Sequence, residues 1–500
     1  MSLPMASTGV EVRETGTITE VKRGVVKLSG LPSCILGQLI QLNRNVRAFV
    51  VGFTDTEVFA LVLGQESGLA VGQRVEVRQQ PLRLPVGPQL LGRVVSPLGE
   101  PLDGISAPEP EAMRPIFQEA PGITDRTPVE RQLLTGIRAI DTMIPLGRGQ
   151  RELIIGDRMS GKTALALDAV LSQRDQNVLC IYCSLGQARH KFLQVMELLR
   201  ERHALDYTVV VAATAAREAS EQFLAPYAAC AIGEHFMRQG RDVLVVFDDL
   251  SKHAWAYRQL SLLLERSPGR EAYPGDMFYI HAQLMERAGQ LSPELGGGSM
   301  TFLPICETQQ GDVTGYISSN LISMTDGQIY LSSELFYEGI KPAVDVGLSV
   351  SRIGNKVQPP LFRWVSRSLR LDLLQDRELQ RLSRFSAMSS QGLIQRQRRG
   401  AILRRLMNQP IHQPSTLADQ SLLFYALKTG WLERLTEDGL RLCLAGLSER
   451  LPAFAQDALR AQEPVTPMLQ AKLDAGLEEL LRPYAQPEGS AHAATEIPAR

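Results

Sequence analysis

The sequence has no long hydrophobic run and almost no net charge. No stretch approaches the roughly 18–20 apolar residues that a membrane-spanning helix needs. The N-terminus, Met1-Ser-Leu-Pro-Met-Ala, lacks the basic region and apolar segment of a secretory signal. The formal net charge of −1 argues against non-specific electrostatic binding to nucleic acid or anionic lipid. Because the chain has 500 residues, we expect several domains with ample hydrophobic core.

Cysteine is also scarce, with six residues in the whole chain. So few cysteines in a chain of this length argue against a disulfide framework. Cys180 and Cys183 form a C-x-x-C pair, but they stand in the apolar run Val178-Leu-Cys-Ile-Tyr-Cys, and no second pair follows at zinc-finger spacing. We therefore interpret them as core residues of a strand, not as a redox or zinc site, and we expect a cytosolic protein.

One short stretch, residues 156–163, carries the clearest chemistry. Gly156-Asp-Arg-Met-Ser-Gly-Lys-Thr fits the phosphate-binding loop G-x-x-x-x-G-K-[ST] at every fixed position. The glycines let backbone N–H groups close around phosphate oxygens, Lys162 supplies positive charge for the β- and γ-phosphates, and the Thr163 hydroxyl can bind Mg²⁺. An apolar strand precedes the loop and an apolar helical pattern follows it, which is the geometry that gathers anions. The loop predicts a nucleoside triphosphate site.

The apolar pattern changes along the chain and predicts a multidomain protein. Residues 1–79 alternate short β-branched runs with turns, which predicts an N-terminal antiparallel β-barrel. Residues 80–360 begin with a Pro/Gly-rich connector and continue as apolar strands separated by helices, which predicts a central α/β nucleotide-binding domain with a mainly parallel sheet. Residues 361–485 have helical periodicity and predict a C-terminal α-helical bundle. Residues 486–500 have the composition of a disordered tail.

A nucleotide site also needs an acid for the metal and a group that acts on water. The apolar run Leu244-Val-Val-Phe ends in Asp248 and Asp249, at the strand end where parallel α/β sheets bind ligands. Asp248 is therefore the candidate Mg²⁺ ligand; the alternative is that both acids cap the next helix. Gln187 follows the strand after the phosphate loop. A glutamine cannot accept a proton, although it can orient water.

Several longer strings of residues stand along the chain. They include Val12-Arg-Glu-Thr-Gly-Thr, Leu91-Gly-Arg-Val-Val, Gly147-Arg-Gly-Gln-Arg-Glu-Leu-Ile-Ile-Gly-Asp-Arg, Asp248-Asp-Leu-Ser-Lys, Ser267-Pro-Gly-Arg-Glu-Ala-Tyr-Pro-Gly-Asp, Thr325-Asp-Gly-Gln-Ile and Val346-Gly-Leu-Ser-Val-Ser-Arg-Ile-Gly. Together these strings resemble the α subunit of F-type rotary ATP synthases, and the resemblance covers almost the whole chain.

This resemblance implies a hexameric ring of alternating α and β subunits around a rotating γ shaft, held by a peripheral stalk. It implies ATP or ADP and Mg²⁺ as ligands, and a peripheral position on the cytoplasmic face of the bacterial inner membrane, where the ring is coupled to a proton- or sodium-transporting sector. In this family α binds Mg-nucleotide without hydrolysing it, and Gln187 stands where the catalytic β subunit carries Glu. The implied metal ligands are Thr163 and Asp248. The implied nucleotide-binding residues are Gly156, Asp157, Arg158, Met159, Ser160, Gly161, Lys162, Thr163, Gln187, Phe336, Lys341 and Gln409.

The resemblance also gives a catalytic role to Arg352. It would reach across the α/β interface to the γ-phosphate bound mainly by the neighbouring β subunit, as an arginine finger in trans. The planar, permanently charged guanidinium suits the phosphoryl transition state. The alternative is an ordinary surface or interface salt bridge.

Several positions depart from the family. Its α chains usually begin with a further helix that anchors the peripheral stalk, whereas the match here starts at Val10, so we expect an altered stalk attachment. Lys341 replaces the usual Arg beside Phe336, and Ile411 replaces a polar residue two positions after Gln409, which puts base affinity and selectivity in doubt.

The shaft-facing region departs as well. Residues 386–390 replace a stretch that usually carries acids and contacts the shaft, and the nearby run Gln395-Arg-Gln-Arg-Arg is basic. A solvated helix face is the default interpretation of that run, and shaft contact is the alternative.

Two other functions stay open on the residues alone. A homohexameric export or secretion ATPase of the same superfamily would carry an acid at position 187 and would lack the α-type strings. A ring helicase acting on RNA would need a basic channel with stacking aromatics, and the N-terminal segment has no clear platform of that kind.

Overall fold

The computed structural model describes residues 13–44, 46–64, 68–383 and 391–485, which form two compact units. Of these residues, unit 1 holds those within Met1–Thr127, Val178–Glu307 and Val313–Thr325, and unit 2 holds those within Pro128–Asn177, Thr308–Asp312 and Asp326–Arg500. Three sequence predictions lie outside the described residues: the start of the family match at Val10, the substituted stretch 386–390 and the tail 486–500.

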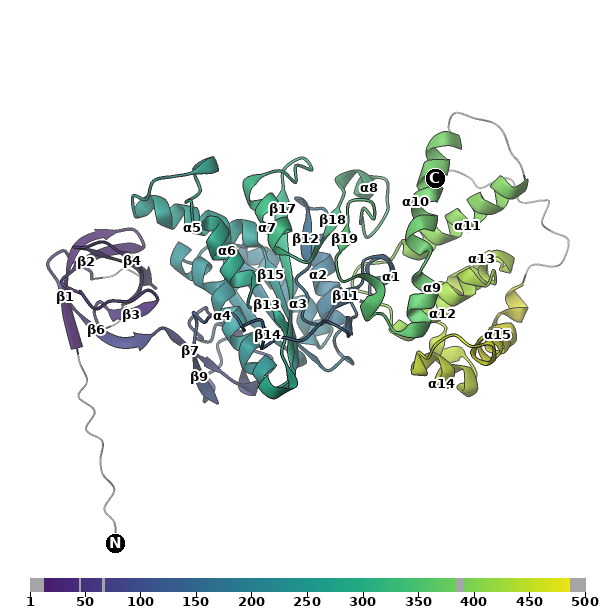
Figure 1. The fold of residues 1–500 in the computed structure, drawn as a ribbon, viewed down its shortest axis with the longest axis horizontal. Coiled ribbons are helices and arrows are strands. Elements are labelled where there is room, and N and C mark those ends of the chain that lie inside the picture. Colours follow the sequence, from purple (N-terminus) through teal and green to yellow (C-terminus); the bar gives the residue numbers. More distant parts are fainter. Residues whose placement is uncertain (1–12, 45, 65–67, 384–390, 486–500) are drawn as a thin grey trace, which may run out of the picture. The chain divides into compact units, whose positions relative to one another are not determined.

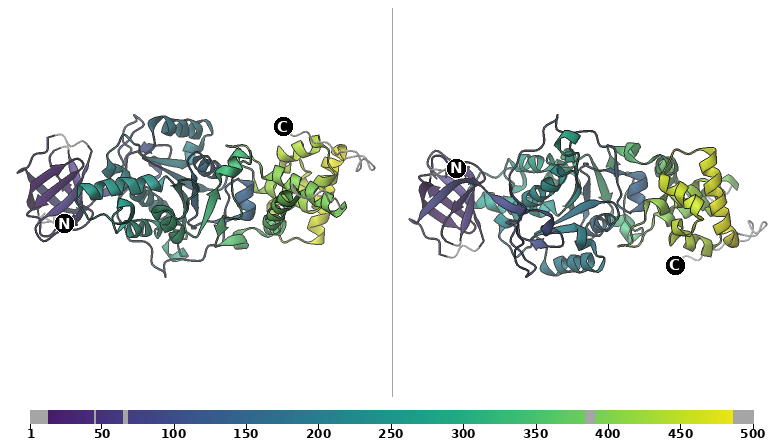
Figure 2. Two further views of the ribbon diagram at one scale, coloured as in Figure 1. Left: turned by 90° about the horizontal axis from the view of Figure 1, so that it is seen from above. Right: turned by 90° about the horizontal axis from the view of Figure 1, so that it is seen from below.

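Six antiparallel strands of unit 1, purple in Figures 1 and 2, close into a barrel. Their order around the barrel is β1-β2-β5-β4-β3-β6. The strands are β1 (Arg13–Lys22), β2 (Val25–Ser29), β3 (Gln38–Gln41), β4 (Arg47–Phe53), β5 (Val58–Leu63) and β6 (Arg74–Pro81). The antiparallel N-terminal barrel predicted from the sequence is confirmed.

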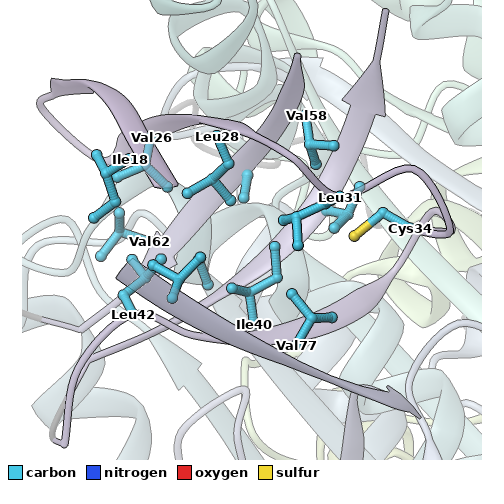
Figure 3. Close-up of a cluster of buried hydrophobic side chains, with 14 of the residues drawn as sticks. Ile18, Val26, Leu28, Leu31, Cys34, Ile40, Leu42, Val58, Val62 and Val77 are labelled. Carbon is cyan, nitrogen blue, oxygen red and sulfur yellow. The ribbon is translucent and has the colours of Figure 1, made fainter. Parts of the chain in front are cut away.

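The barrel closes because alternate residues of its strands are apolar and meet inside. Val26 and Leu28 of β2, and Val75 and Val77 of β6, are buried at every second position, as the two-residue repeat of a strand requires. Figure 3 shows side chains of this buried cluster, with Val26, Leu28 and Val77 among those labelled, pointing toward one another in the interior.

The rest of unit 1 is built on a parallel sheet with the order β17-β15-β13-β14-β8. Its interior strands are apolar and buried along their whole length, as expected for a sheet covered on both faces. The strands are β8 (Val94–Val95), β13 (Val178–Leu185), β14 (Thr208–Ala213), β15 (Asp242–Asp248) and β17 (Ser299–Thr308), with β16 (Gly289–Gln290) antiparallel to β17 and a separate pair β7 (Arg83–Val86) and β9 (Ala112–Pro115).

Helix α4 (Ala219–Arg238) of unit 1 packs on β13, β14 and β15 (Figure 1). It is almost wholly buried, and its Glu234 forms a buried ion pair of 2.6 Å with Arg287. Cys180 and Cys183 of β13 are buried and unpaired, which confirms their interpretation as core residues. The helices of unit 1 are α3 (Arg189–Glu201), α4 (Ala219–Arg238), α5 (Leu250–Leu263), α6 (Met277–Met285) and α7 (Tyr316–Met324).

Unit 2 contains three paired strands and the described C-terminal helices. Strand β12 (Leu153–Asp157) pairs in parallel with β18 (Gly327–Leu331), which pairs antiparallel with β19 (Val350–Ser351). The short strands β10 (Gln132–Leu133) and β11 (Leu146–Gly147) pair with each other. Near these strands in the chain stand α1 (Arg138–Met143), α2 (Lys162–Leu171) and α8 (Ser333–Tyr337).

The C-terminal part of unit 2 is helical, as the sequence predicts (green to yellow in Figure 2). Fully buried side chains such as Phe362, Phe424 and Leu477 form its core. Among the described residues, no helix is both long and apolar enough to cross a membrane. The helices are α9 (Pro360–Ser366), α10 (Leu369–Ser383), α11 (Gln391–Met407), α12 (Leu417–Lys428), α13 (Glu437–Leu444), α14 (Ala453–Ala461) and α15 (Pro467–Leu481).

Candidate nucleotide site

The phosphate loop joins β12 to α2 in unit 2, as expected from the strand–loop–helix pattern. Two of its glycines are required by the backbone. Gly161 has φ of 100° at the start of α2, a left-handed conformation that strains other residues. A Cβ on Gly156 would lie 2.5 Å from the Leu331 carbonyl oxygen of the neighbouring strand β18. Gly156 and Gly161 therefore stand at positions where the backbone of the loop requires glycine.

Asp157 ties the start of the loop to two other segments of unit 2. Its carboxylate accepts hydrogen bonds from the Gly311 N–H (2.8 Å), the Thr308 hydroxyl (2.7 Å) and the Ser333 hydroxyl (3.2 Å). Partial burial tends to raise the pKa of this carboxyl, but the three donors outweigh it and hold the pKa below its usual value. Asp157 therefore acts as an ionised anchor of the loop.

The donors expected for phosphate stand around the loop. The Lys162 ammonium donates to the carbonyl oxygens of Gly156 (2.8 Å) and Asp157 (2.5 Å), so it bridges the beginning of the loop. The Ser160 hydroxyl is buried without a hydrogen-bond partner among the described residues. Arg158 and Met159 are exposed at the tip. An orphaned hydroxyl, a lysine and a helix N-terminus fit a phosphate group.

A pocket lies beside the loop in unit 2. Its walls are mostly apolar, and Phe336, Lys341 and Gln409 all line it, together with Ser160, Gly161, Asp168, Pro410 and Ile411 among others. The Lys341 ammonium lies 5.2 Å from the centre of the Phe336 ring, a cation–π contact. The structure thus brings the three residues expected around the base next to the phosphate loop, although they are far apart in the sequence.

Gln409 is buried, and its side chain is committed to the wall of this pocket. Its amide nitrogen donates to the carbonyl oxygens of Gly136 (2.8 Å) and Gln413 (2.7 Å), while its amide oxygen accepts from the Arg138 N–H (3.0 Å). These contacts hold the segment after α11 against the start of α1. Gln409 is therefore a structural part of the pocket whose hydrogen-bonding groups are already engaged.

Asp168 lines the pocket and contacts His412, and the sequence alone did not indicate either residue. Asp168, on α2, lines the pocket and accepts a hydrogen bond from the His412 backbone N–H (2.7 Å), and its carboxylate lies 3.1 Å from the ring Nδ1 of the same residue. The two residues are 244 positions apart, so no local pattern could have paired them.

In unit 1, Asp248 and Gln187 lie at the ends of neighbouring strands β15 and β13. Asp248 is buried, and its Oδ2 accepts a hydrogen bond of 2.7 Å from the Tyr182 hydroxyl. The Gln187 side-chain amide donates to the Asp248 backbone oxygen at 3.3 Å. Asp249 caps α5 by accepting from the Lys252 N–H, so the capping alternative holds for Asp249 but not for the Asp248 carboxylate.

The described residues contain no group of three or more His, Cys, Asp or Glu side chains that could hold a metal ion by themselves. Mg²⁺ usually takes one or two protein ligands and completes its shell with phosphate oxygens and water. Thr163 is half-buried at the start of α2 in unit 2, and Asp248 is buried at the end of β15 in unit 1. Each carries side-chain oxygen of the kind that Mg²⁺ binds.

Arg352 follows β19 in unit 2 and is exposed. Its backbone N–H donates to the Asp326 carbonyl oxygen at 2.8 Å, and the Asp326 carboxylate is held by Arg151 through contacts of 2.8 and 3.1 Å. None of the described residues forms a hydrogen bond or ion pair with the Arg352 guanidinium. The salt-bridge alternative therefore finds no partner within the described part of this chain.

Three models of one known protein family match most of the chain. Residues 11–77 match the model of the ATP synthase alpha/beta family, beta-barrel domain, and residues 136–351 match the nucleotide-binding domain of the same family. Residues 358–481 match the ATP synthase alpha/beta chain, C terminal domain. An ATP synthase subunit alpha from Caldanaerobacter subterraneus subsp. tengcongensis is 46% identical over 480 residues, 95% of each chain. One from Lactiplantibacillus plantarum is 46% identical over 450 residues, which are 90% of this chain and 89% of that protein.

Proposed function

The chain belongs to the ATP synthase alpha/beta family as an α-type, nucleotide-binding regulatory subunit of a rotary ATPase. We propose that its residues have two separate roles. Its own site holds Mg-nucleotide without hydrolysing it. Arg352 serves the site of a neighbouring β subunit. Both roles belong to a complex with β, γ and further subunits, which acts as a peripheral assembly on the cytoplasmic face of the membrane.

In the chain's own site, the phosphate loop from Gly156 to Thr163 grips the phosphates of ATP or ADP. Phe336 offers a face to the base, with Lys341 beside it. Mg²⁺ held by Thr163 and Asp248 would neutralise phosphate charge when bound. Gln409 contributes by fixing the pocket wall.

The observation that carries the non-catalytic assignment is Gln187. It is buried, its amide is bonded to the backbone of Asp248, and it has no carboxylate that could take a proton from water. The site therefore has residues that can bind a nucleotide, but it lacks a general base at position 187.

The observations that support the Arg352 role are its exposure and its free guanidinium. The backbone is anchored at Asp326, while the side chain forms no hydrogen bond or ion pair with the described residues. An arginine whose backbone is held in place and whose guanidinium is exposed can bind a phosphate on another subunit.

The test uses the assembled complex of this chain with its β and γ subunits. Arg352→Ala should assemble normally, bind nucleotide at its own site normally, and lose about 10³–10⁵-fold in kcat for ATP hydrolysis. Arg450→Ala is the matched control, because Arg450 is also an exposed arginine of unit 2; its turnover should match that of the unmodified complex. Retention of most turnover by Arg352→Ala would overturn the finger. Sustained hydrolysis by the isolated chain would overturn the non-catalytic assignment and favour a homohexameric motor.

A further inference from the structure

Glu152 is a fully buried carboxyl group at the entrance to the strand that leads to the phosphate loop. Its Oε2 accepts a hydrogen bond of 2.7 Å from the Gln150 amide, while Oε1 has no hydrogen-bond partner among the described residues. A Cβ on Gly327 would lie 2.6 Å from Oε2, so the carboxyl is closely packed against β18. A buried acid with one unused oxygen calls for an explanation.

Two charged residues act on this carboxyl, Asp326 and Arg352. Burial, and then the negative charge of Asp326, hold the pKa of Glu152 well above its usual value, whereas Arg352 acts in the opposite direction. Arg151 lies next in the chain but is committed to the Asp326 carboxylate through its side chain and its backbone N–H (3.0 Å). Arg352 is therefore the cation available to Glu152.

We propose that Glu152 is a positioning residue for Arg352. With Glu152 neutral, the guanidinium is free to extend toward the neighbouring subunit; with Glu152 ionised, the guanidinium is drawn back to the unused Oε1. This inference rests on the proposed role of Arg352 as a finger in trans.

The reason is that a buried carboxylate cannot stay unpaired without a large loss of stability. If Glu152 releases its proton to solvent, the free energy falls when the Arg352 guanidinium moves in as its counter-ion. If Arg352 is instead bound to a phosphate of the neighbour, Glu152 loses that counter-ion and takes up a proton from solvent. Linkage makes the two effects reciprocal: binding of the finger favours the neutral acid, and the neutral acid favours binding of the finger.

The strands give this coupling a short path. Glu152 directly precedes β12, β12 pairs with β18, and β18 pairs with β19, which ends one residue before Arg352. The position of the finger is thus set by a group on the strand that enters this chain's own phosphate loop.

The test compares the pH dependence of ATP hydrolysis in complexes that carry Glu152→Gln, Glu221→Gln or no change. A single ionisation that withdraws the finger lowers kcat by up to about tenfold for each pH unit above its pKa. The unmodified complex should therefore lose kcat toward alkaline pH, and Glu152→Gln, which cannot ionise, should lose markedly less relative to its own value at neutral pH. Glu221 is the matched control in unit 1, because it is also buried, has a raised pKa and has an Oε2 without a hydrogen-bond partner among the described residues, although that atom lies 3.7 Å from the Arg217 guanidinium. Its variant should follow the unmodified profile.

The outcomes separate this inference from the proposed function. In the background of Arg352→Ala, the residual activity should have the same pH profile with and without the Glu152→Gln change, because no finger remains to be withdrawn. Identical alkaline profiles for the unmodified and Glu152→Gln complexes, with Arg352→Ala inactive, would overturn the role of Glu152 and leave the finger intact. If Glu152→Gln does not assemble, proton uptake on binding of Mg-ATP decides: uptake by the unmodified complex that is lost in Arg352→Ala supports the inference, and equal uptake by both overturns it.

Discussion

The hydroxyl of Tyr182 donates a hydrogen bond of 2.7 Å to Oδ2 of Asp248, the carboxylate that we propose as a ligand of Mg²⁺. Both side chains are buried, and they extend from neighbouring strands β13 and β15. Burial, and then the charge of Asp248, raise the pKa of Tyr182 well above its usual value, so this hydroxyl stays a donor. Tyr182 therefore holds one oxygen of Asp248 in place and thereby fixes the orientation of the carboxylate.

Tyr182→Phe should loosen this carboxylate. We expect a loss of about 1–3 kcal/mol in the free energy of unfolding, since Asp248 loses a buried donor. We also expect nucleotide binding to need more Mg²⁺, because the metal ligand is no longer held. Urea unfolding measures the first effect, and titration of Mg²⁺ at fixed ATP measures the second.

Tyr425→Phe is the matched control for this change. Tyr425 is also buried and its hydroxyl contacts an aspartate, Asp474, at 3.1 Å, but it belongs to the C-terminal helices of unit 2. That variant should lose stability without any change in Mg²⁺ dependence. Equal Mg²⁺ titrations for Tyr182→Phe and the unmodified chain would remove Tyr182 from the metal site.

Gln409→Ala should weaken the pocket as a whole. The change leaves the carbonyl oxygens of Gly136 and Gln413 and the Arg138 N–H without their side-chain partner, so we expect a loss of about 2–4 kcal/mol in stability. Because the amide is engaged within the chain, affinity for ATP and for GTP should fall by the same factor. Binding of fluorescent analogues of both nucleotides measures this ratio.

Gln456→Ala provides the comparison, since the Gln456 amide also donates to two carbonyl oxygens, those of Glu449 and Leu451, within the C-terminal helices. It should lose stability and keep its nucleotide affinity. A selective loss of ATP affinity in Gln409→Ala, with GTP affinity unchanged, would show that Gln409 reads the base directly.

The barrel, the buried strands and the phosphate loop could be predicted from sequence because each follows from a local pattern. Alternate apolar residues such as Val75 and Val77 mark a strand with one buried face, and Gly156 and Gly161 stand where the loop demands glycine. The contacts of Tyr182 with Asp248 and of Asp168 with His412 follow no such pattern, because they depend on how strands and loops pair.

Helical periodicity predicted that residues 361–485 are helical, but not which face of each helix is buried. Leu371 is 58% exposed, whereas Leu369 and Leu373 of the same helix α10 are buried. Which side of a helix is covered depends on its neighbours, here α1, α9 and α11. The same holds for Gln409. The sequence indicated a residue near the nucleotide, but it did not indicate that the Gln409 side chain is hydrogen-bonded to Gly136, Gln413 and Arg138.

The stability of the chain should fall between about pH 6.5 and pH 4 because of two buried histidines. His253 and His281 face each other with 3.2 Å between ring nitrogens, and both are fully buried. Burial lowers the pKa of His253 to about 4 and that of His281 well below its usual value. The unfolded chain therefore binds protons in this window that the folded chain does not, so stability decreases as the pH falls. For His253 alone, the loss in the free energy of unfolding at pH 5 is about 2 kcal/mol.

Urea unfolding at pH 7.5 and pH 5 measures this loss of stability. The loss should be smaller for His281→Phe, which removes one of the two buried histidines, and unchanged for His190→Gln, which alters an exposed histidine. Equal losses in all three chains would contradict the assignment.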